Sequence, residues 1–162
     1  MTPRTRNLLL LAIPLGVYFL FQLFLLNNVS IAQYDESIYL DVARNIRKTG
    51  LPLRSVGLDG RYHFDHLPLY VYLLSGMTAL FGENTFLVRL VTMLAGAGAV
   101  TMTGIIGLRA KDGATGFVAA LLLALNSFFA TYAYFIREEV FFALFVLLAS
   151  YYLLRLGQTK EN

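Results

Sequence analysis

The sequence predicts an all-α polytopic membrane protein. We expect four transmembrane helices, or five if a short apolar segment also crosses, and an external loop with amphipathic juxtamembrane helices. Hydrophobic residues make up 57% of the 162 positions, charged residues only 14%, and the mean hydropathy is +0.63. About a quarter of the residues in ordinary soluble domains are charged. A single long polar stretch, Asn27–Pro68, separates the apolar runs. A lipid bilayer therefore surrounds most of this chain.

The first apolar run, Leu8 to Leu26, is predicted to be an uncleaved transmembrane helix. About 19 residues span a hydrocarbon core, whereas the apolar region of a signal peptide has roughly 7–15 residues. Arg4 and Arg6 precede this run, and no comparable basic cluster directly follows it. The positive-inside rule therefore places the N-terminus in the cytoplasm and the segment 27–85 outside.

The external segment opens with two adjacent carboxylates, Asp35 and Glu36, and continues into a predicted amphipathic helix. Gly50 and then Pro52 end the helical pattern. Such a helix is suited to lying on the membrane surface. Its apolar residues recur at helical spacing, at Ile38, Tyr39, Val42, Ala43 and Ile46.

The apolar segment Leu69 to Phe81 leaves two topologies open. Its roughly 13–15 residues suit an interfacial or re-entrant segment better than a span, although tilting or local thinning of the bilayer would let it cross. If it crosses, Arg109 and Lys111 lie outside. If it does not, both face the cytoplasm together with Arg155 and Lys160. The charge rule favours the second topology, with four spans.

Three further spans follow in this topology, at 86–108, 114–135 and 140–156, and the whole chain, 1–162, is one membrane domain. Small residues on one face of a membrane helix allow close packing against its neighbours. In the 86–108 span they repeat at every fourth position, at Ala95, Ala99, Thr103 and Gly107. We interpret this face as packing rather than chemistry.

Ionisable residues gather on the predicted outer side, because the external segment and the turn before the last span both lie there. They are Asp35, Glu36, Asp65, His66, Arg89, Arg137, Glu138 and Glu139. Charged groups at a membrane boundary are costly and mark a functional site by default. A carboxylate can take a proton from an acceptor, and guanidinium groups can hold a phosphate leaving group. The set therefore indicates a reaction on an anionic lipid substrate.

Each of these residues also has a structural interpretation. Asp35 is a favoured cap for a helix that begins at Glu36, and a carboxylate such as Glu36 in a first helical turn suits the helix dipole. Arg89 and Arg137 can anchor spans at the level of the lipid headgroups. Glu138 can serve as the local ion-pair partner of Arg137. Spacing alone does not separate these roles from catalytic ones.

Other classes of site are excluded or weak. Cysteine is absent, so disulfides and thiolate chemistry are excluded, and the sequence has no GxGxxG, Walker or HExxH motif. The basic residues are dispersed, which argues against nucleic acid as a partner. His63, Asp65 and His66 form a weak metal cluster, so no cofactor is assigned and a divalent cation stays open.

The order of these features carries a family resemblance. After the basic N-terminus and first span come Tyr34-Asp35-Glu36, Thr49-Gly50, His66-Leu67-Pro68-Leu69-Tyr70, Phe81-Gly82, Phe86-Leu87-Val88-Arg89-Leu90, Arg109 and Arg137-Glu138. This order resembles the N-terminal half of polytopic GT-C glycosyltransferases of the protein O-mannosyltransferase and aminoarabinose-transferase type. It extends over essentially the whole chain.

The resemblance implies a role for each matching residue. Asp35 matches the catalytic acidic residue of the first external loop, the general base on the acceptor, and Glu36 completes the acidic pair. His66 and Pro68 match a His-Pro-Pro signature in which Leu67 replaces one proline. The positions expected to bind substrate are His66, Arg89, Arg137 and Glu138.

The implied reaction moves a sugar from a polyprenyl-phosphate donor to an acceptor at the outer face of a bacterial or archaeal cell membrane, with inversion at the anomeric carbon. Family members are much longer than this chain. A second chain that supplies the missing transmembrane helices is therefore one expected partner, besides the donor lipid and the bilayer. The alternative is a non-catalytic membrane subunit that binds lipid-linked sugar or a partner transferase. A transporter is disfavoured, because the span interiors hold no ionisable residue.

Overall fold

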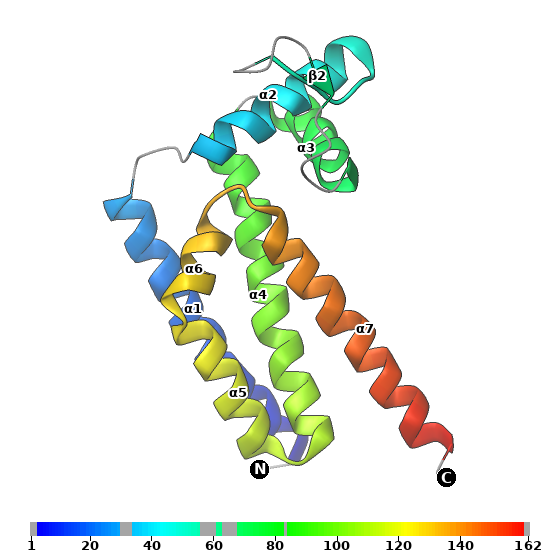
Figure 1. The fold of residues 1–162 in the computed structure, drawn as a ribbon. Helices are drawn as coiled ribbons and strands as arrows, with labels where there is room; N and C mark the ends of the chain where they lie inside the picture. The colour runs from blue at the N-terminus through cyan, green and yellow to red at the C-terminus, as the bar shows by residue number, and fades with distance from the viewer. Residues whose placement is uncertain (1–2, 30–33, 56–60, 63–67, 83, 161–162) are drawn as a thin grey trace.

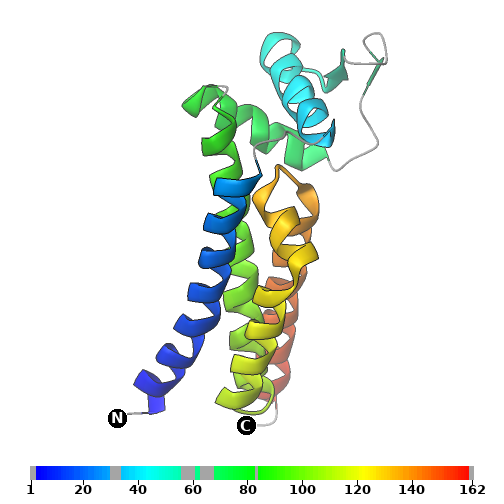
Figure 2. The same cartoon turned by 90° about the vertical axis from the view of Figure 1, so that its left-hand side faces the viewer.

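The computed structural model describes residues 3–29, 34–55, 61–62, 68–82 and 84–160. A helical bundle carries a smaller layer across one end (Figures 1 and 2). The predicted all-α membrane class is confirmed. The bundle contains α1 (Pro3–Asn28), α4 (Thr85–Ala110), α5 (Gly113–Leu125), α6 (Ser127–Tyr134) and α7 (Glu138–Lys160), and the end layer contains α2 (Tyr34–Thr49), β1 (Leu53–Arg54), β2 (Arg61–Tyr62) and α3 (Pro68–Phe81).

Three helices within the described residues are long and apolar enough to cross a membrane alone, at Leu9–Asn28, Thr85–Ala110 and Glu138–Gly157. The pair α5 and α6 passes the same test together, but it is bent by 64°. The described part of the chain therefore has three candidate spans, or four if the bent pair forms one.

The bend at Asn126 differs from the continuous helix predicted over 114–135. Asn126 is extended and ends α5, and its Oδ1 accepts the backbone N–H of Phe129 at 2.9 Å. Asparagine is among the best residues at a helix N-terminus, because its side chain satisfies an amide that has no partner within the helix. One polar side chain therefore starts a new helix inside an apolar run.

Helix α3 lies in the end layer rather than in the bundle (Figure 2). Its 14 residues extend about 21 Å at ~1.5 Å each, less than the ~30 Å of a hydrocarbon core. It packs against α2, where the rings of Tyr39 and Tyr70 meet edge-on with centroids 5.2 Å apart. Val42, Leu74 and Ile136 belong to the apolar cluster at this contact. The predicted apolar face of α2 is thus buried against α3 and the end of the bundle.

The two ends of the bundle are formed by different segments of the chain. Both termini lie at one end, where the α4–α5 turn holds Arg109 and Lys111 (Figure 1). The α6–α7 turn lies at the other end, beside the layer formed by α2 and α3. The first long connection and the residues around Arg137 therefore meet at one end, as a four-span topology requires.

Helix α4 occupies the centre of the bundle and contacts α1, α3, α5, α6 and α7. The small residues on its surface lie in packed contacts. Ala99 is fully buried, and a Cβ atom added to Gly107 would come within 2.8 Å of the Gly116 Cα on α5. A Cβ on Gly116 would collide with the carbonyl oxygen of Gly104. The absence of side chains at these glycines lets the two helix backbones approach closely.

Hydrogen bonds fasten α1 to the other bundle helices. The Tyr18 hydroxyl donates to the Met93 carbonyl oxygen at 2.8 Å, and Gln22 Nε2 donates to the Ala130 carbonyl oxygen at 3.0 Å. Both side chains are fully buried. Bonds of this kind between membrane helices contribute on the order of 1 kcal/mol each.

Replacement of Gly116 by alanine should destabilise the bundle by about 2 kcal/mol, since overpacking a tight contact typically costs ~1–3 kcal/mol. The measurement is unfolding of the purified chain in detergent. Gly16→Ala is the matched control, because no atom lies within 4 Å of the added Cβ. The control should be neutral or more stable. Equal effects at the two positions would contradict close packing of α4 and α5.

Candidate functional site

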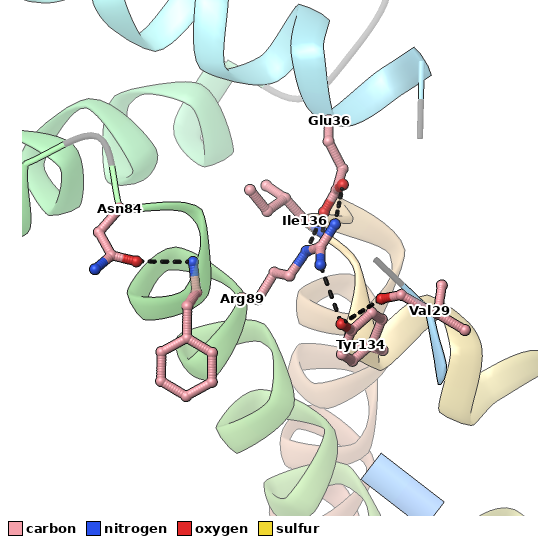
Figure 3. Close-up of polar contacts among 7 residues, drawn as sticks. Val29, Glu36, Asn84, Arg89, Tyr134 and Ile136 are labelled. Carbon is pink, nitrogen blue, oxygen red and sulfur yellow. Dashed lines mark hydrogen bonds and ion pairs between the residues drawn. The ribbon is translucent and has the colours of Figure 1, made fainter. Parts of the chain in front are cut away.

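A buried ion pair lies at the end of the bundle beneath α2. Glu36 is 0% exposed and Arg89 is 8% exposed. Arg89 Nε donates to Glu36 Oε1 at 2.9 Å, and Arg89 Nη2 donates to Glu36 Oε2 at 2.6 Å (Figure 3). The backbone N–H of Ile136 also donates to Oε1, at 2.9 Å. The Glu36 carboxylate is therefore closed off from solvent and bound by donors from Arg89 and Ile136.

Tyr134 connects this ion pair to α1. Arg89 Nη1 donates to the Tyr134 hydroxyl at 3.1 Å, and that hydroxyl donates to the Val29 carbonyl oxygen at 2.8 Å (Figure 3). The guanidinium carbon of Arg89 also lies 4.8 Å from the centre of the Tyr134 ring, a favourable position for a cation. We refer to the network of Val29, Glu36, Arg89, Tyr134 and Ile136 as the clamp. It joins the ends of α1, α2 and α4 to the α6–α7 turn.

Helical periodicity explains why the two adjacent carboxylates separate. Successive residues of a helix point about 100° apart, while residues three or four apart share a face. Glu36 shares the inward face of α2 with Tyr39 and Ala43, both fully buried. Helix α2 begins at Tyr34, so Asp35 lies within its first turn rather than capping a helix that starts at Glu36.

Asp35 points away from the clamp and pairs with Arg137. Arg137 Nη1 lies 2.6 Å from Asp35 Oδ2, and the Asp35 side chain is 36% exposed. The same Nη1 lies 3.5 Å from Glu139 Oε1, and the guanidinium carbon lies 4.8 Å from the centre of the Tyr132 ring. Asp35 is thus a carboxylate that solvent can reach and that a cation holds in place.

The structure brings four of the predicted site residues together at this end, namely Asp35, Glu36, Arg89 and Arg137. Glu138 lies in the first turn of α7 and borders an apolar groove of about 290 Å³ between α3 and α7. The groove is lined by Pro68, Leu69, Tyr70, Leu73, Glu138, Phe141, Phe142 and Phe145.

The predicted histidine positions are not tested by this arrangement. His66, which was predicted to bind substrate, lies outside the described residues, as do His63 and Asp65. Among the residues that are described, no group of three or more His, Cys, Asp or Glu side chains could hold a metal ion.

Two buried phenols of the end layer stay protonated at neutral pH. Burial raises the pKa of Tyr39 well above its usual range, and the charges of Glu138 and Glu139 raise it further. Burial likewise raises the pKa of Tyr70. A group whose charged form is disfavoured in this way cannot act as a base at neutral pH. Among these residues, Asp35 is therefore the better candidate for proton removal.

Tyr134, which bonds to both Arg89 and Val29, was not among the predicted site residues. The available signal was the aromatic pair Tyr134-Phe135 close to Arg137 at the end of an apolar run. Aromatic residues are common at membrane interfaces, so this pattern alone does not reveal a buried hydroxyl that bridges two helices.

Loss of the Glu36 charge should destabilise the protein far more than loss of the Asp35 charge. Glu36→Gln leaves the buried Arg89 uncompensated, which costs about 3–5 kcal/mol, whereas a surface pair contributes ~0–1 kcal/mol. Unfolding in detergent of Glu36→Gln and Asp35→Asn measures both losses. Addition of Arg89→Met to Glu36→Gln should restore part of the stability. Similar losses for the two single variants would contradict the clamp.

The larger, C-terminal part of the chain is similar to a known protein family. Residues 65–162 match the family model described as dolichyl-phosphate-mannose-protein mannosyltransferase. This match covers more than half of the chain. It includes Arg89, Arg137 and Glu138, while Asp35 and Glu36 precede it. No curated protein and no solved structure matches the chain.

Proposed function

Because the chain belongs to the dolichyl-phosphate-mannose-protein mannosyltransferase family, we propose that it is a glycosyltransferase, or the N-terminal catalytic module of one, with a polyprenyl-phosphate sugar donor. The resemblance drawn from the order of residues is confirmed at the level of the family. One observation carries the proposal: Asp35 is a partly exposed carboxylate held 2.6 Å from Arg137. A carboxylate beside a guanidinium group suits sugar transfer from a phosphate, because the carboxylate can take the acceptor proton and the cation can stabilise the departing phosphate.

In the proposed reaction an acceptor hydroxyl oxygen attacks the anomeric carbon, and the bond from that carbon to the phosphate oxygen breaks with inversion. Asp35 takes the hydroxyl proton. The phosphate leaves with the bonding electron pair, and the positive charge of Arg137 stabilises it. The contact from Arg137 to Glu139, at 3.5 Å, is longer than its contact to Asp35, at 2.6 Å. We expect a phosphate oxygen to replace this contact.

We assign Glu36 to positioning rather than to proton transfer, although the sequence pattern paired it with Asp35 as catalytic. A general base must come within hydrogen-bond reach of the proton that it removes. Glu36 is fully buried, and its Oε1 already accepts bonds from Arg89 and Ile136. Arg89, predicted to bind substrate, is turned toward Glu36 and Tyr134 and receives the same positioning role. Together they hold the helix that carries Asp35.

The groove between α3 and α7 is the proposed place for the first isoprenoid units of the donor. Its walls are almost entirely hydrocarbon, with Phe141 and Phe145 on α7 and Leu73 on α3. Glu138, at its border, directly follows Arg137 in the chain. A phosphate held at Arg137 would therefore have its lipid tail at the opening of this groove.

We place the clamp end of the bundle outside the membrane and the N-terminus in the cytoplasm. The support is the charge of the short segment between α4 and α5, because Arg109 and Lys111 lie there, at the end that also holds both termini (Figure 1). Arg155, near the end of α7, lies there too. Basic residues concentrate on the cytoplasmic side of membrane proteins.

The test is transfer of labelled sugar from polyprenyl-phosphate donors in membranes that contain this chain. Asp35→Asn should lower the rate by about 100-fold or more, the usual contribution of a general base, without loss of donor retention. Asp112→Asn is the matched control, because Asp112 caps α5 at the opposite end of the bundle. It should leave the transfer rate unchanged.

Equal transfer by the parent chain and Asp35→Asn would overturn the assignment of the base. Retention of donor lipid without transfer, in both proteins and after a second membrane chain is supplied, would instead establish a non-catalytic binding subunit. Transfer that appears only with the second chain, and that Asp35→Asn abolishes, supports a catalytic module.

A further inference from the structure

A polar cavity lies between α2, α3 and the start of α4, away from Asp35 and Arg137. Its volume is about 130 Å³. That is room for about four waters at ~30 Å³ each, or for one tetrahedral anion. Its walls combine two guanidinium groups with two threonines, and the lining residues are Leu40, Arg44, Arg47, Thr78 and Thr85. The proposed function assigns no role to any of them.

Helical spacing aligns this cavity with the clamp. Glu36, Leu40 and Arg44 follow one another at every fourth position of α2, and Thr85 precedes Arg89 by four residues on α4. Residues four apart lie on the same face of a helix. The Glu36–Arg89 ion pair joins α2 to α4. Leu40 and Arg44 lie one and two turns further along α2, Thr85 lies one turn earlier on α4, and all three line the cavity. The clamp therefore fixes the distance between opposite walls of the cavity.

Both arginines are placed to present charge to this cavity. Arg47 Nη1 donates to the Thr78 carbonyl oxygen at 2.9 Å, which ties its guanidinium to α3. Arg44 precedes Arg47 by three residues on the same helix and lines the same space.

The remaining walls suit the same ligand. Thr85 is the first residue of α4, where the helix dipole favours negative charge. Thr78 completes the wall from α3, where its hydroxyl donates to the Ser75 carbonyl oxygen at 3.1 Å. Guanidinium groups and hydroxyls are common donors to phosphate oxygens. The cavity therefore offers donors from α2 and α4, and none of the described residues that line it is a carboxylate.

We propose that this cavity binds a phosphate group, either the headgroup phosphate of a membrane lipid or a soluble phosphate. Helix α2 is amphipathic and lies at the end of the membrane bundle, where basic side chains meet lipid headgroups. The site is separate from sugar transfer, because it contains neither Asp35 nor Arg137. Its occupancy would brace α2 against α3 and α4.

The test uses the purified full chain in a neutral detergent. Phosphatidylglycerol is titrated in one arm and inorganic phosphate in the other, and native mass spectrometry counts the bound ligand. Arg44→Gln and Arg47→Gln should each weaken binding about tenfold, the effect of losing one charge-assisted hydrogen bond. Lys48→Gln is the matched control, since Lys48 is an exposed cation of the same helix outside the lining set.

Arg44→Lys separates loss of charge from misfolding, because it keeps the cation and should keep most of the binding. Binding of phosphatidylglycerol alone identifies a lipid headgroup, and competition by inorganic phosphate identifies a soluble ligand. Either result supports the site.

Equal binding by the parent chain, Arg44→Gln and Arg47→Gln would overturn the proposal, as would an equal loss in Lys48→Gln. Asp35→Asn should bind phosphate normally even where it abolishes sugar transfer. A failure of this site and a failure of the proposed function are therefore distinguishable.

Discussion

The ion pair between Glu36 and Arg89 determines how the end layer sits on the bundle. Removing two charges from water costs several kcal/mol for each ion, and only good geometry with further hydrogen bonds offsets this cost. Here both carboxylate oxygens are bound, Ile136 adds a backbone donor, and Tyr134 receives the third guanidinium nitrogen. Helix α2 packs on α3 and β1 and shares an apolar cluster with Val88 of α4, and the long side chains of the ion pair add a polar connection to α4.

As a consequence, the neighbouring carboxylates Glu36 and Asp35 have different surroundings and different proposed roles. The clamp turns Glu36 inward, and the helical repeat then directs Asp35 toward Arg137 and solvent. A reactive group works best when surrounding contacts fix its position before the substrate arrives. The buried Glu36–Arg89 pair therefore helps to position the partly exposed Asp35–Arg137 pair. The Glu36–Arg89 pair also fixes α2 relative to α4 at the arginine-lined cavity, which begins one turn further along α2.

Local patterns were sufficient to predict most of the helices. The apolar spacing of α2 predicted the face that it buries, and Gly50 ends that helix with a positive φ of 76° while its N–H donates to the Ile46 carbonyl oxygen. The break at Asn126 was missed because the hydrophobicity of the run outweighed a single capping residue. Asn126-Ser127 is nonetheless a recognisable helix-start signal.

Tertiary contacts account for the rest of what the sequence could not predict. Topology was enough to place Asp35, Glu36, Arg89 and Arg137 at one end, but not to choose their partners. Glu36 bonds to a residue 53 positions away, and no spacing rule selects Arg89 over Arg137. The bond from Tyr134 to Val29 spans 105 positions and depends on how α1 packs beside α6. The assignment of acid pairs therefore required the folded structure.

The clamp is tested most directly by a distance measurement across it. The chain has no cysteine, so two introduced cysteines can carry spin labels without background, at exposed positions 48 on α2 and 127 on α6. Double electron–electron resonance then reports how firmly α2 is held. If the clamp holds α2, the distance distribution is narrow in the parent chain and in Asp35→Asn, and broad in Glu36→Gln. An equally narrow distribution in Glu36→Gln would contradict this role of the clamp, because other contacts would then be holding α2.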